Sequence, residues 1–216
     1  LYQILVNGLH NGCLYAVLAY SYVLLHQVVP KPNLAHGAFF ALSGQVLVLA
    51  VNLGYNALIF AFAASLGFGF LASAFISLVA VSIFAVLIVP RFASQSPNMM
   101  IVATLALAIV LMEAVRIGAD GRDFWLPPLS NAQVPLGWGA SVTRVQMFNM
   151  VMMVVMLVLA DFILARTSAG RQIRAVAQDK IAAAFCGIDV HRVIVGTAAT
   201  SAIMSLFGGY LALLYF

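Results

Sequence analysis

Charged side chains are scarce in this sequence. Lys, Arg, Asp and Glu make up 7% of the 216 residues, whereas hydrophobic residues make up 64%. A soluble domain carries about 25% charged and about 45–50% apolar residues. Ten basic and six acidic side chains are too few to cover a chain of this size in water. A soluble enzyme, a nucleic-acid-binding protein and a disordered scaffold are therefore excluded, and we expect the chain to fold in membrane lipid.

Cysteine is also rare, and no arrangement typical of a catalytic or metal site is present. Cys13 and Cys186 lie far apart, so the sequence indicates no disulfide framework. No phosphate-binding loop of the Gly-x-x-x-x-Gly-Lys type occurs. Four histidines, none at the i, i+4 spacing of a zinc site, are scattered along the chain: His10, His26, His36 and His191. We expect no catalytic residue, no metal and no cofactor, and we expect this chain not to bind ATP itself.

Long apolar runs predict the fold. About 20 apolar residues cross the hydrocarbon core of a bilayer, and a backbone in lipid must satisfy its own hydrogen bonds, which favours helices. Prolines at positions 30, 32 and 90 and polar stretches separate the runs. The sequence therefore predicts an all-α, polytopic transmembrane bundle of about six spans, at residues 2–25, 33–53, 62–89, 99–117, 145–165 and 193 to the chain end.

The distribution of basic residues predicts the orientation of these spans. The segment 166–192 holds five of the ten basic residues: Arg166, Arg171, Arg174, Lys180 and Arg192. Loops rich in Lys and Arg remain in the cytoplasm. Counting back through alternating spans also places Arg91 and Lys31 inside, and it places the loop 118–144 outside. We therefore expect a multi-pass protein with its segment 166–192 in the cytoplasm.

The segment between the fifth and sixth spans has a helical pattern but is too polar to cross a membrane. Ser168 is a plausible N-cap, and Gly187 is a plausible residue to end the helix in a left-handed turn. Apolar residues between them recur at three- and four-residue spacing: Ile173, Val176, Ala177, Ile181, Ala184, Phe185 and Ile188. Two interpretations stay open. The helix lies on the inner leaflet, or it docks in a groove of a cytoplasmic partner.

Four stretches of the chain resemble one transporter family. They read GRQIRAVAQDKIAAAFCGIDVHRVI (170–194), PNLAHGAFFALSG (32–44), NGLHNGCLYAVLAYSYVLLHQVV (7–29) and RDFWLPPL (122–129). They are similar, respectively, to the coupling segment, the Asn-x-Ala-His-Gly segment, the first helix and an extracellular loop of branched-chain amino acid ABC permeases of the LivH/LivM type. The four stretches follow one another along the chain as they do in that family. Ala38 stands where the family usually has an acidic residue, and Ser21 where it usually has glycine.

The resemblance implies a permease subunit of an ATP-driven importer for branched-chain or other small apolar amino acids. Residues 1–216 would form a single transmembrane domain that lacks the family's C-terminal helices, with a cytoplasmic coupling segment at 166–192. That segment would contact the ATPase through residues at the matching positions: Arg171, Arg174, Ala177, Asp179, Ala183 and Gly187.

The partners implied by the resemblance are cytoplasmic ABC ATPase subunits, a second permease subunit (identical or paralogous) and an extracytoplasmic solute-binding protein. The implied location is the cytoplasmic membrane of a bacterium or archaeon. Three alternatives stay open. The first is an ABC permease for urea, short amides or sugars. The second is an ATP-independent channel or carrier, which predicts broken or charged helices at the midplane. The third is an intramembrane enzyme, for which no cluster of acid, base or metal ligands is visible.

Several intramembrane residues are candidates for the translocation pathway. Asn33, His36 and Gly37 begin the second predicted span, and a helix N-terminus suits a carboxylate. The alternative is structural: Asn33 caps the helix, His36 makes an interhelical hydrogen bond, and Gly37 permits close packing. Glu113 is a further pathway candidate because ionisable residues in membranes are often functional, but it also lies three residues before Arg116 and can pair with it.

A stripe of small residues lies on the first predicted span. Gly8, Gly12 and Ala16 recur at four-residue spacing. Such stripes allow two membrane helices to approach closely. We therefore expect this face of the first helix to pack against another helix.

Overall fold

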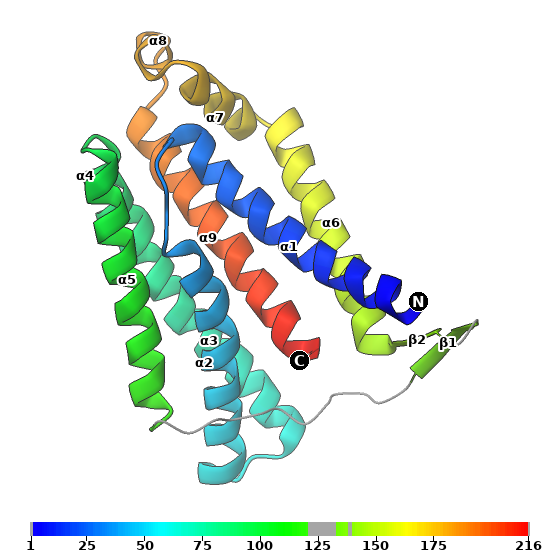
Figure 1. Ribbon diagram of the computed structural model, residues 1–216. Helices are drawn as coiled ribbons and strands as arrows, with labels where there is room; N and C mark the ends of the chain where they lie inside the picture. Colours follow the sequence, from blue (N-terminus) through cyan, green and yellow to red (C-terminus); the bar gives the residue numbers. More distant parts are fainter. Residues whose placement is uncertain (1, 121–132, 138–139, 216) are drawn as a thin grey trace.

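The computed structural model describes residues 2–120, 133–137 and 140–215, and most of them are helical (Figure 1). Two short π-helical segments, η1 and η2, interrupt or extend the α-helices. The elements in chain order are α1 (Tyr2–Val28), α2 (His36–Asn52), η1 (Leu53–Ala57), α3 (Phe62–Ser82), η2 (Ile83–Ile88), α4 (Val89–Ala93), α5 (Pro97–Gly118), β1 (Gln133–Gly137), β2 (Ala140–Thr143), α6 (Arg144–Arg166), α7 (Ser168–Gln178), α8 (Lys180–Phe185) and α9 (Val190–Tyr215).

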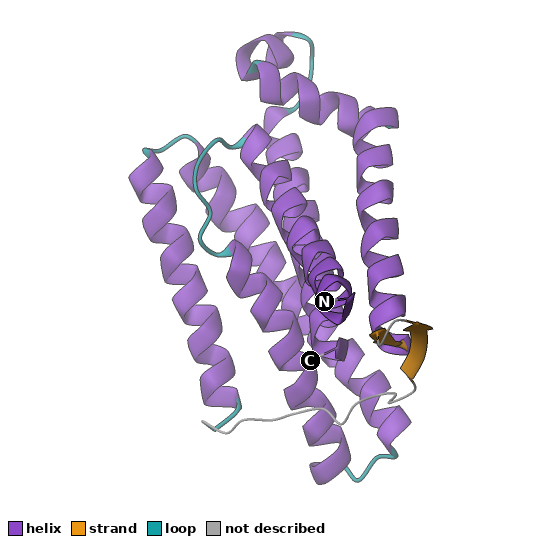
Figure 2. Cartoon of the chain, turned by 45° about the vertical axis from the view of Figure 1, so that its right-hand side comes forward, coloured by secondary structure: helices purple, strands orange, loops and turns teal. Residues whose placement is uncertain are grey.

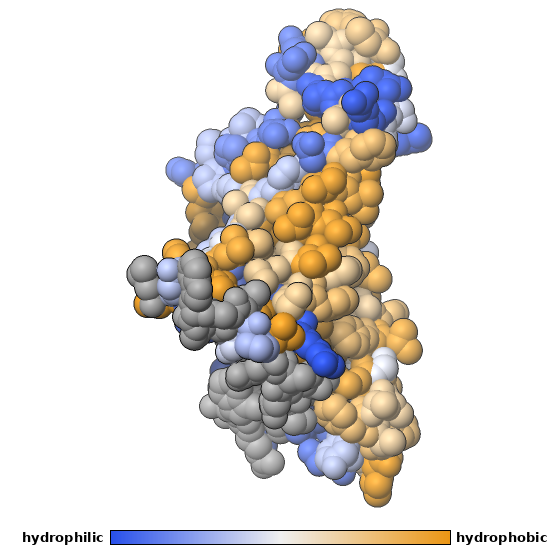
Figure 3. Space-filling model, turned by 90° about the vertical axis from the view of Figure 1, so that its right-hand side faces the viewer, coloured by the Kyte–Doolittle hydropathy of each residue, from blue (hydrophilic) through white to orange (hydrophobic). Residues whose placement is uncertain are grey.

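Five helices are long and apolar enough to cross a membrane: His36–Ala57, Phe62–Ala93, Pro97–Gly118, Arg144–Arg166 and Val190–Tyr215. Helix α1 has 27 residues but is not among them, since polar residues such as Asn7 and Asn11 lower its hydropathy. The predicted all-α membrane bundle is confirmed, and the count of six spans is approximate. Figure 3 shows an apolar surface over the middle of one side of the molecule and a hydrophilic cap at one end.

The third predicted span is longer than expected. Pro90 was expected to end it, but the helix continues through η2 and α4 to Ala93, so that 32 residues form one span. Segment η2 is π-helical, so its hydrogen bonds span five residues rather than the four of an α-helix. The N–H of Val89, for example, bonds to the carbonyl of Phe84. Because a proline ring meets the carbonyl four residues earlier in a regular α-helix, we attribute the tolerance of Pro90 to this widened turn.

A short β-hairpin was not expected. Strands β1 and β2 pair antiparallel just before α6 (Figure 2). Gln3 at the start of α1 fastens the hairpin, because its side chain donates to the Ser141 carbonyl (3.0 Å) and accepts from the Ser141 N–H (2.9 Å). The stretch 122–129, which carried part of the family resemblance, lies outside the described residues.

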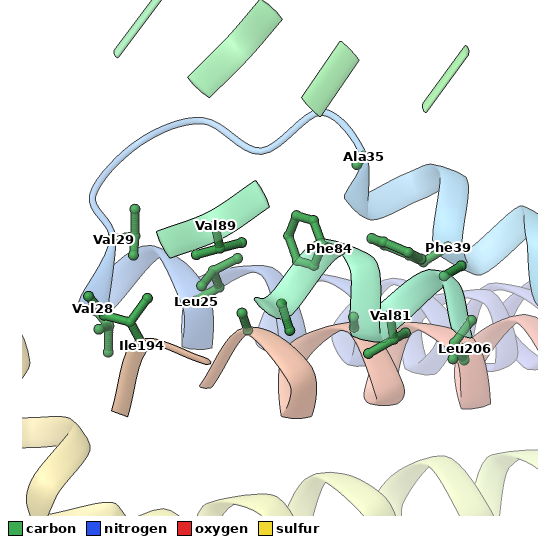
Figure 4. Close-up of a cluster of buried hydrophobic side chains, with 14 of the residues drawn as sticks. Leu25, Val28, Val29, Ala35, Phe39, Val81, Phe84, Val89, Ile194 and Leu206 are labelled. Atoms are coloured by element: carbon green, nitrogen blue, oxygen red, sulfur yellow. The ribbon is translucent and has the colours of Figure 1, made fainter. Parts of the chain in front are cut away.

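Helix α9 lies at the centre of the bundle, between α1 and α2 (Figure 1). The main hydrophobic core joins side chains from α1, α2, η2, α4, α5 and α9. Phe39 and Phe84 are fully buried in it, with ring centroids 5.0 Å apart (Figure 4). Polar side chains also join these helices, since Ser73 on α3 donates to the Ser43 carbonyl on α2 and bonds to the Tyr210 hydroxyl on α9.

The approach of α9 to α2 requires glycine at one position. A Cβ atom built on Gly209 would collide with the Phe40 carbonyl oxygen and with the Ser43 hydroxyl. The Ser43 hydroxyl lies there because it donates to the Leu206 carbonyl across the same interface. The bond between the two helices and their close contact therefore depend on one another.

We predict that Gly209→Ala destabilises the folded chain by about 1–3 kcal/mol, the usual cost of overpacking a tight interior. The measurement is the thermal unfolding midpoint of the detergent-purified protein. Gly196→Ala on the same helix is the matched control, because a Cβ there meets nothing within 4 Å. Equal midpoints for the two variants would contradict the proposed close contact.

Candidate functional site

One end of the molecule collects most of the basic residues. The ends of α1 and α4, the start of α9 and the helices α7 and α8 all lie there (Figure 1). The residues at this end include seven of the ten Lys and Arg side chains: Lys31, Arg91, Arg166, Arg171, Arg174, Lys180 and Arg192. By the positive-inside rule we expect this end to face the cytoplasm.

The amphipathic segment at this end is two helices rather than the one helix that the sequence predicted. The cap of α7 is Thr167, whose hydroxyl accepts from the Gly170 N–H, so the prediction of Ser168 as N-cap is wrong. Asp179 adopts an extended conformation and ends α7. Its carboxylate accepts from the N–H groups of Ile181 (2.8 Å) and Ala182 (3.1 Å), so that it caps α8.

The expected left-handed end of the segment is confirmed at Gly187. This residue has φ +80° and directly follows the last turn of α8. Its N–H donates to the Ala184 carbonyl (3.0 Å), and the Ile188 N–H donates to the Ala183 carbonyl (3.1 Å). This is the bond pattern of a Schellman motif, which satisfies the last carbonyl groups of a helix.

Helix α7 packs directly on the end of α6. Gly170 is buried against it, and a Cβ atom there would collide with the backbone carbonyls of Leu164 and Ile163. The guanidinium of Arg174 donates to the same Leu164 carbonyl. Val176 on α7 and Ala183 on α8 belong to the main hydrophobic core. The segment is therefore part of the folded body and not a loose connector.

These contacts separate the six predicted ATPase-contact residues into two groups. Arg174, Asp179, Ala183 and Gly187 build the segment itself through the contacts above. Arg171 and Ala177 take no part in these contacts. Of the six residues only Ala183 is buried, and the other five are exposed. Ile181 and Phe185, which belong to the recurring apolar residues of the segment but not to the predicted ATPase contacts, have relative exposures of 71% and 89%.

The exposure of Ile181 and Phe185 follows from their helical spacing. In a helix with 3.6 residues per turn, Ala183 shares the face of Val176, whereas Ile181 and Phe185 lie about 140° and about 180° away from it. Val176 and Ala183 are buried in the core, and Ile181 and Phe185 point away from it. The break at Asp179 divides the segment into α7 and α8. The signal for this break was present in the sequence, because aspartate before a short helical run favours the N-cap position.

Two lysines lie close together beside this segment. Lys31, in the linker after α1, donates to the carbonyls of Phe92 (3.2 Å) and Ala93 (2.6 Å) and to that of Gln95, and thus satisfies the end of α4. Partial burial and the nearby Lys31 ammonium lower the pKa of Lys180 below its ordinary value. The linker, α4 and α8 thus meet at one place.

The start of α2 differs from the prediction. Asn33 does not cap the helix, which begins at His36 and has Ala35 as its N-cap without a side-chain bond. The Asn33 side-chain oxygen accepts instead from the Ala35 N–H (3.1 Å). The expected interhelical hydrogen bond of His36 is confirmed, since its Nε2 lies 2.8 Å from the Ser21 hydroxyl on α1. Gly37 is exposed, and a Cβ there meets nothing within 4 Å, so the packing role expected for it is wrong within this chain.

The remaining candidates lie elsewhere. Glu113 pairs with Arg116, with 2.9 Å between Oε2 and Nε, at the end of α5 opposite the basic end, and both side chains are largely exposed. Gly8, Gly12 and Ala16 are exposed on α1, and a Cβ at either glycine meets nothing within 4 Å. The expected packing of this stripe therefore does not occur among the described residues of this chain.

An open groove of about 590 Å³ lies between α2, η1, α3 and α5, toward the end opposite the basic residues. Its walls are mainly apolar, with Leu42, Val46 and Phe68 among the lining residues. Asn52 and Asn56 supply polar groups to its lining. The groove therefore resembles a lipid-facing crevice more than a polar binding site.

Comparison with known proteins identifies the family. A family model described as "Branched-chain amino acid transport system / permease component" matches residues 4–216. The chain belongs to this family. The match runs from α1 to the end of α9, so it includes both the basic end with α7 and α8 and the start of α2. No solved structure matches the chain.

Characterised relatives carry the same description. The chain is 26% identical to the high-affinity branched-chain amino acid transport system permease protein LivH of Escherichia coli K12, over 97% of this chain and 69% of LivH. It is 25% identical to the corresponding permease protein BraD of Pseudomonas aeruginosa, over 94% of this chain and 67% of BraD. The five apolar helices described above agree with a multi-pass membrane permease.

We predict that Gly187→Val loosens α8, because a β-branched residue at positive φ costs about 1–2 kcal/mol or more. Limited trypsin cleavage of the segment 166–192 should become about tenfold faster. Gly187→Asn is the control, since asparagine tolerates the left-handed conformation. Cleavage at the same rate in wild type and in the valine variant would show that the turn does not hold α8 in place.

Proposed function

We propose that this chain is a permease subunit of an ATP-driven importer for branched-chain or other small apolar amino acids. Its residues 1–216 form a transmembrane domain whose segment 166–192 docks on a cytoplasmic ATPase subunit. The observation that carries this proposal is the rigid, exposed helix pair α7–α8 at the basic end of a membrane bundle of this family. An extracytoplasmic solute-binding protein delivers the substrate, and the host is a bacterium or archaeon.

The packing of α7 and α8 supports a mechanical role. Force applied to this segment reaches the membrane helices because Val176 and Ala183 share one core with residues of α1, α4 and α9. Gly170 and Arg174 fix α7 to the end of α6. A helix that only lies on the lipid surface needs no such fixation, so these contacts favour the docking interpretation.

The contact surface on α8 is small and apolar with a basic border. Ile181 and Phe185 are four residues apart, and neither is covered by any other described part of the chain. Adjacent exposed apolar side chains outside the membrane are typical of a surface that a partner covers. Lys180, the first residue of α8, adds positive charge directly before Ile181. We infer that the ATPase offers an apolar pocket with acidic residues at its rim.

The proposal also assigns surfaces to the second permease subunit and to the pathway. The exposed small stripe of Gly8, Gly12 and Ala16 suits close contact with a helix of a second permease subunit, identical or paralogous. Asn33, His36 and Gly37 are the pathway candidates that lie inside the bundle. Glu113 is the weaker pathway candidate, because its charge is already balanced by Arg116.

We predict that Phe185→Asp reduces ATP-dependent uptake by tenfold or more, as expected for the loss of a central interface aromatic worth about 2 kcal/mol. The variant chain should still reach the membrane, because the side chain is 89% exposed. The measurement is uptake together with ATP hydrolysis in a reconstituted complex. Phe185→Leu, which keeps an apolar contact, is the control. Wild-type coupling in the aspartate variant would contradict docking through α8.

The proposed orientation predicts one-sided labelling. In a background with Cys13 and Cys186 changed to alanine, Gln178→Cys on exposed α7 should react with a membrane-impermeant thiol reagent only from the cytoplasmic side. Asn56→Cys, exposed at the opposite end, should react only from outside. Reaction of Gln178→Cys from outside would overturn the orientation.

A further inference from the structure

Helix α2 begins inside the bundle and not at its basic end. The linker from Val29 to Ala35 runs from the end of α1 down to the start of α2 in both Figure 1 and Figure 2. The partner of His36 is Ser21, seven residues before the end of α1, which is about 10 Å along that helix. The Leu34 N–H donates to the Thr104 hydroxyl, seven residues into α5.

The positive end of α2 is not neutralised by the described part of the chain. The first N–H groups of a helix lack partners within the helix and carry partial positive charge. The first turn of α2 contains no acidic residue, and Ala35 supplies no side-chain cap. Gly37 lies in this turn, is exposed, and leaves open space where a side chain would stand. At Gly37, therefore, no side chain shields the backbone of the first turn from a small molecule.

A second, independent observation also indicates a missing hydrogen-bond acceptor. Asn33 is 5% exposed, and its side-chain Nδ2 has no hydrogen-bond partner. The oxygen of the same carboxamide bonds to the Ala35 N–H (3.1 Å), which holds the planar group against the N-cap of α2. Nδ2 thus lies at this turn as an unpaired buried donor, which is costly unless an acceptor reaches it.

We propose that the start of α2 binds the carboxylate of the transported amino acid during its passage. The carboxylate accepts from Asn33 Nδ2 and from N–H groups of the first turn of α2. This inference rests on the proposed import of amino acids and names the group that the pathway recognises. Helix N-termini inside membrane transporters are suited to anionic substrate groups.

The chemistry favours a single negative charge and an apolar tail. The donors are neutral, and the ammonium of Lys31, the basic residue of the preceding linker, is bonded to carbonyls at the end of α4. A dianion such as phosphate would need cationic partners, whereas a carboxylate needs only a few N–H donors. Leu34, which is 47% exposed and directly follows Asn33, and Ala41, one turn after Gly37, offer apolar contacts to such a tail.

The first test replaces the donor and keeps the shape. Asn33→Asp retains the oxygen that binds the Ala35 N–H, removes the Nδ2 donor and adds a negative charge. In the complete complex with its ATPase and binding protein, uptake of L-leucine should fall about tenfold or more, as expected for losing a hydrogen bond to a charged group. Asn52→Asp, the same change at the other end of α2, should leave uptake intact. Wild-type uptake in Asn33→Asp would overturn the inference.

The second test does not depend on transport. In the background without native cysteines, Gly37→Cys should react about tenfold faster with a thiol reagent bearing a sulfonate than with one bearing a trimethylammonium group. Isovalerate should slow this reaction, whereas isoamylamine should not. Gly196→Cys, at an open position of α9, should show neither preference.

The two tests separate this inference from the proposed function. If the wild-type complex imports leucine but Gly37→Cys shows no anion preference, the inference is wrong and the proposed function stands. If the wild-type complex imports neither branched-chain nor other small apolar amino acids, the proposed function fails and the assignment of an amino acid carboxylate fails with it.

Discussion

The requirement that a backbone in lipid satisfy its own hydrogen bonds determines this structure. It makes nearly every described segment helical, and it makes each exception informative. Two exceptions lie at functional candidates. The linker 29–35 carries non-helical backbone into the bundle, where the Ala35 and Leu34 N–H groups bond to Asn33 and Thr104. The break at Asp179 lies outside the membrane, where the same side chain caps the next helix. Each departure from helix thus has its own set of side-chain partners.

Helix α9 connects these two places. Its first turns lie beside α7 and α8. Its middle contacts the start of α2, because the Ser205 hydroxyl donates to the His36 carbonyl (3.0 Å). One turn earlier, the Ser201 hydroxyl donates to the carbonyl of Ser21 on α1 (2.6 Å). Farther along, Gly209 permits direct contact with α2. A displacement of α8 by an ATPase can therefore reach the start of α2 through one rigid helix. Coupling of this kind needs packed elements that move together.

Most of the fold could be predicted from apolar periodicity, and the details that position the site could not. The spans at α5 and α6 were located to within two residues, because proline, glycine and charged residues bound them. The continuation of the third span past Pro90 depends on a widened turn that no composition rule reveals. The depth at which α2 begins is set by tertiary hydrogen bonds of His36 and Leu34. The division of the amphipathic segment into α7 and α8 was missed, although Asp179, which caps α8, carried a signal for it.

The central claim is that this bundle works as a permease driven by an ATPase bound at α7 and α8. The most direct measurement is purification of the tagged full-length protein from its native host in mild detergent, followed by identification of its partners by mass spectrometry. The account predicts recovery of an ATPase with a phosphate-binding loop together with a solute-binding protein. Repeated recovery of the chain alone, from preparations that keep other transporters intact, would contradict it and would favour an ATP-independent channel or carrier.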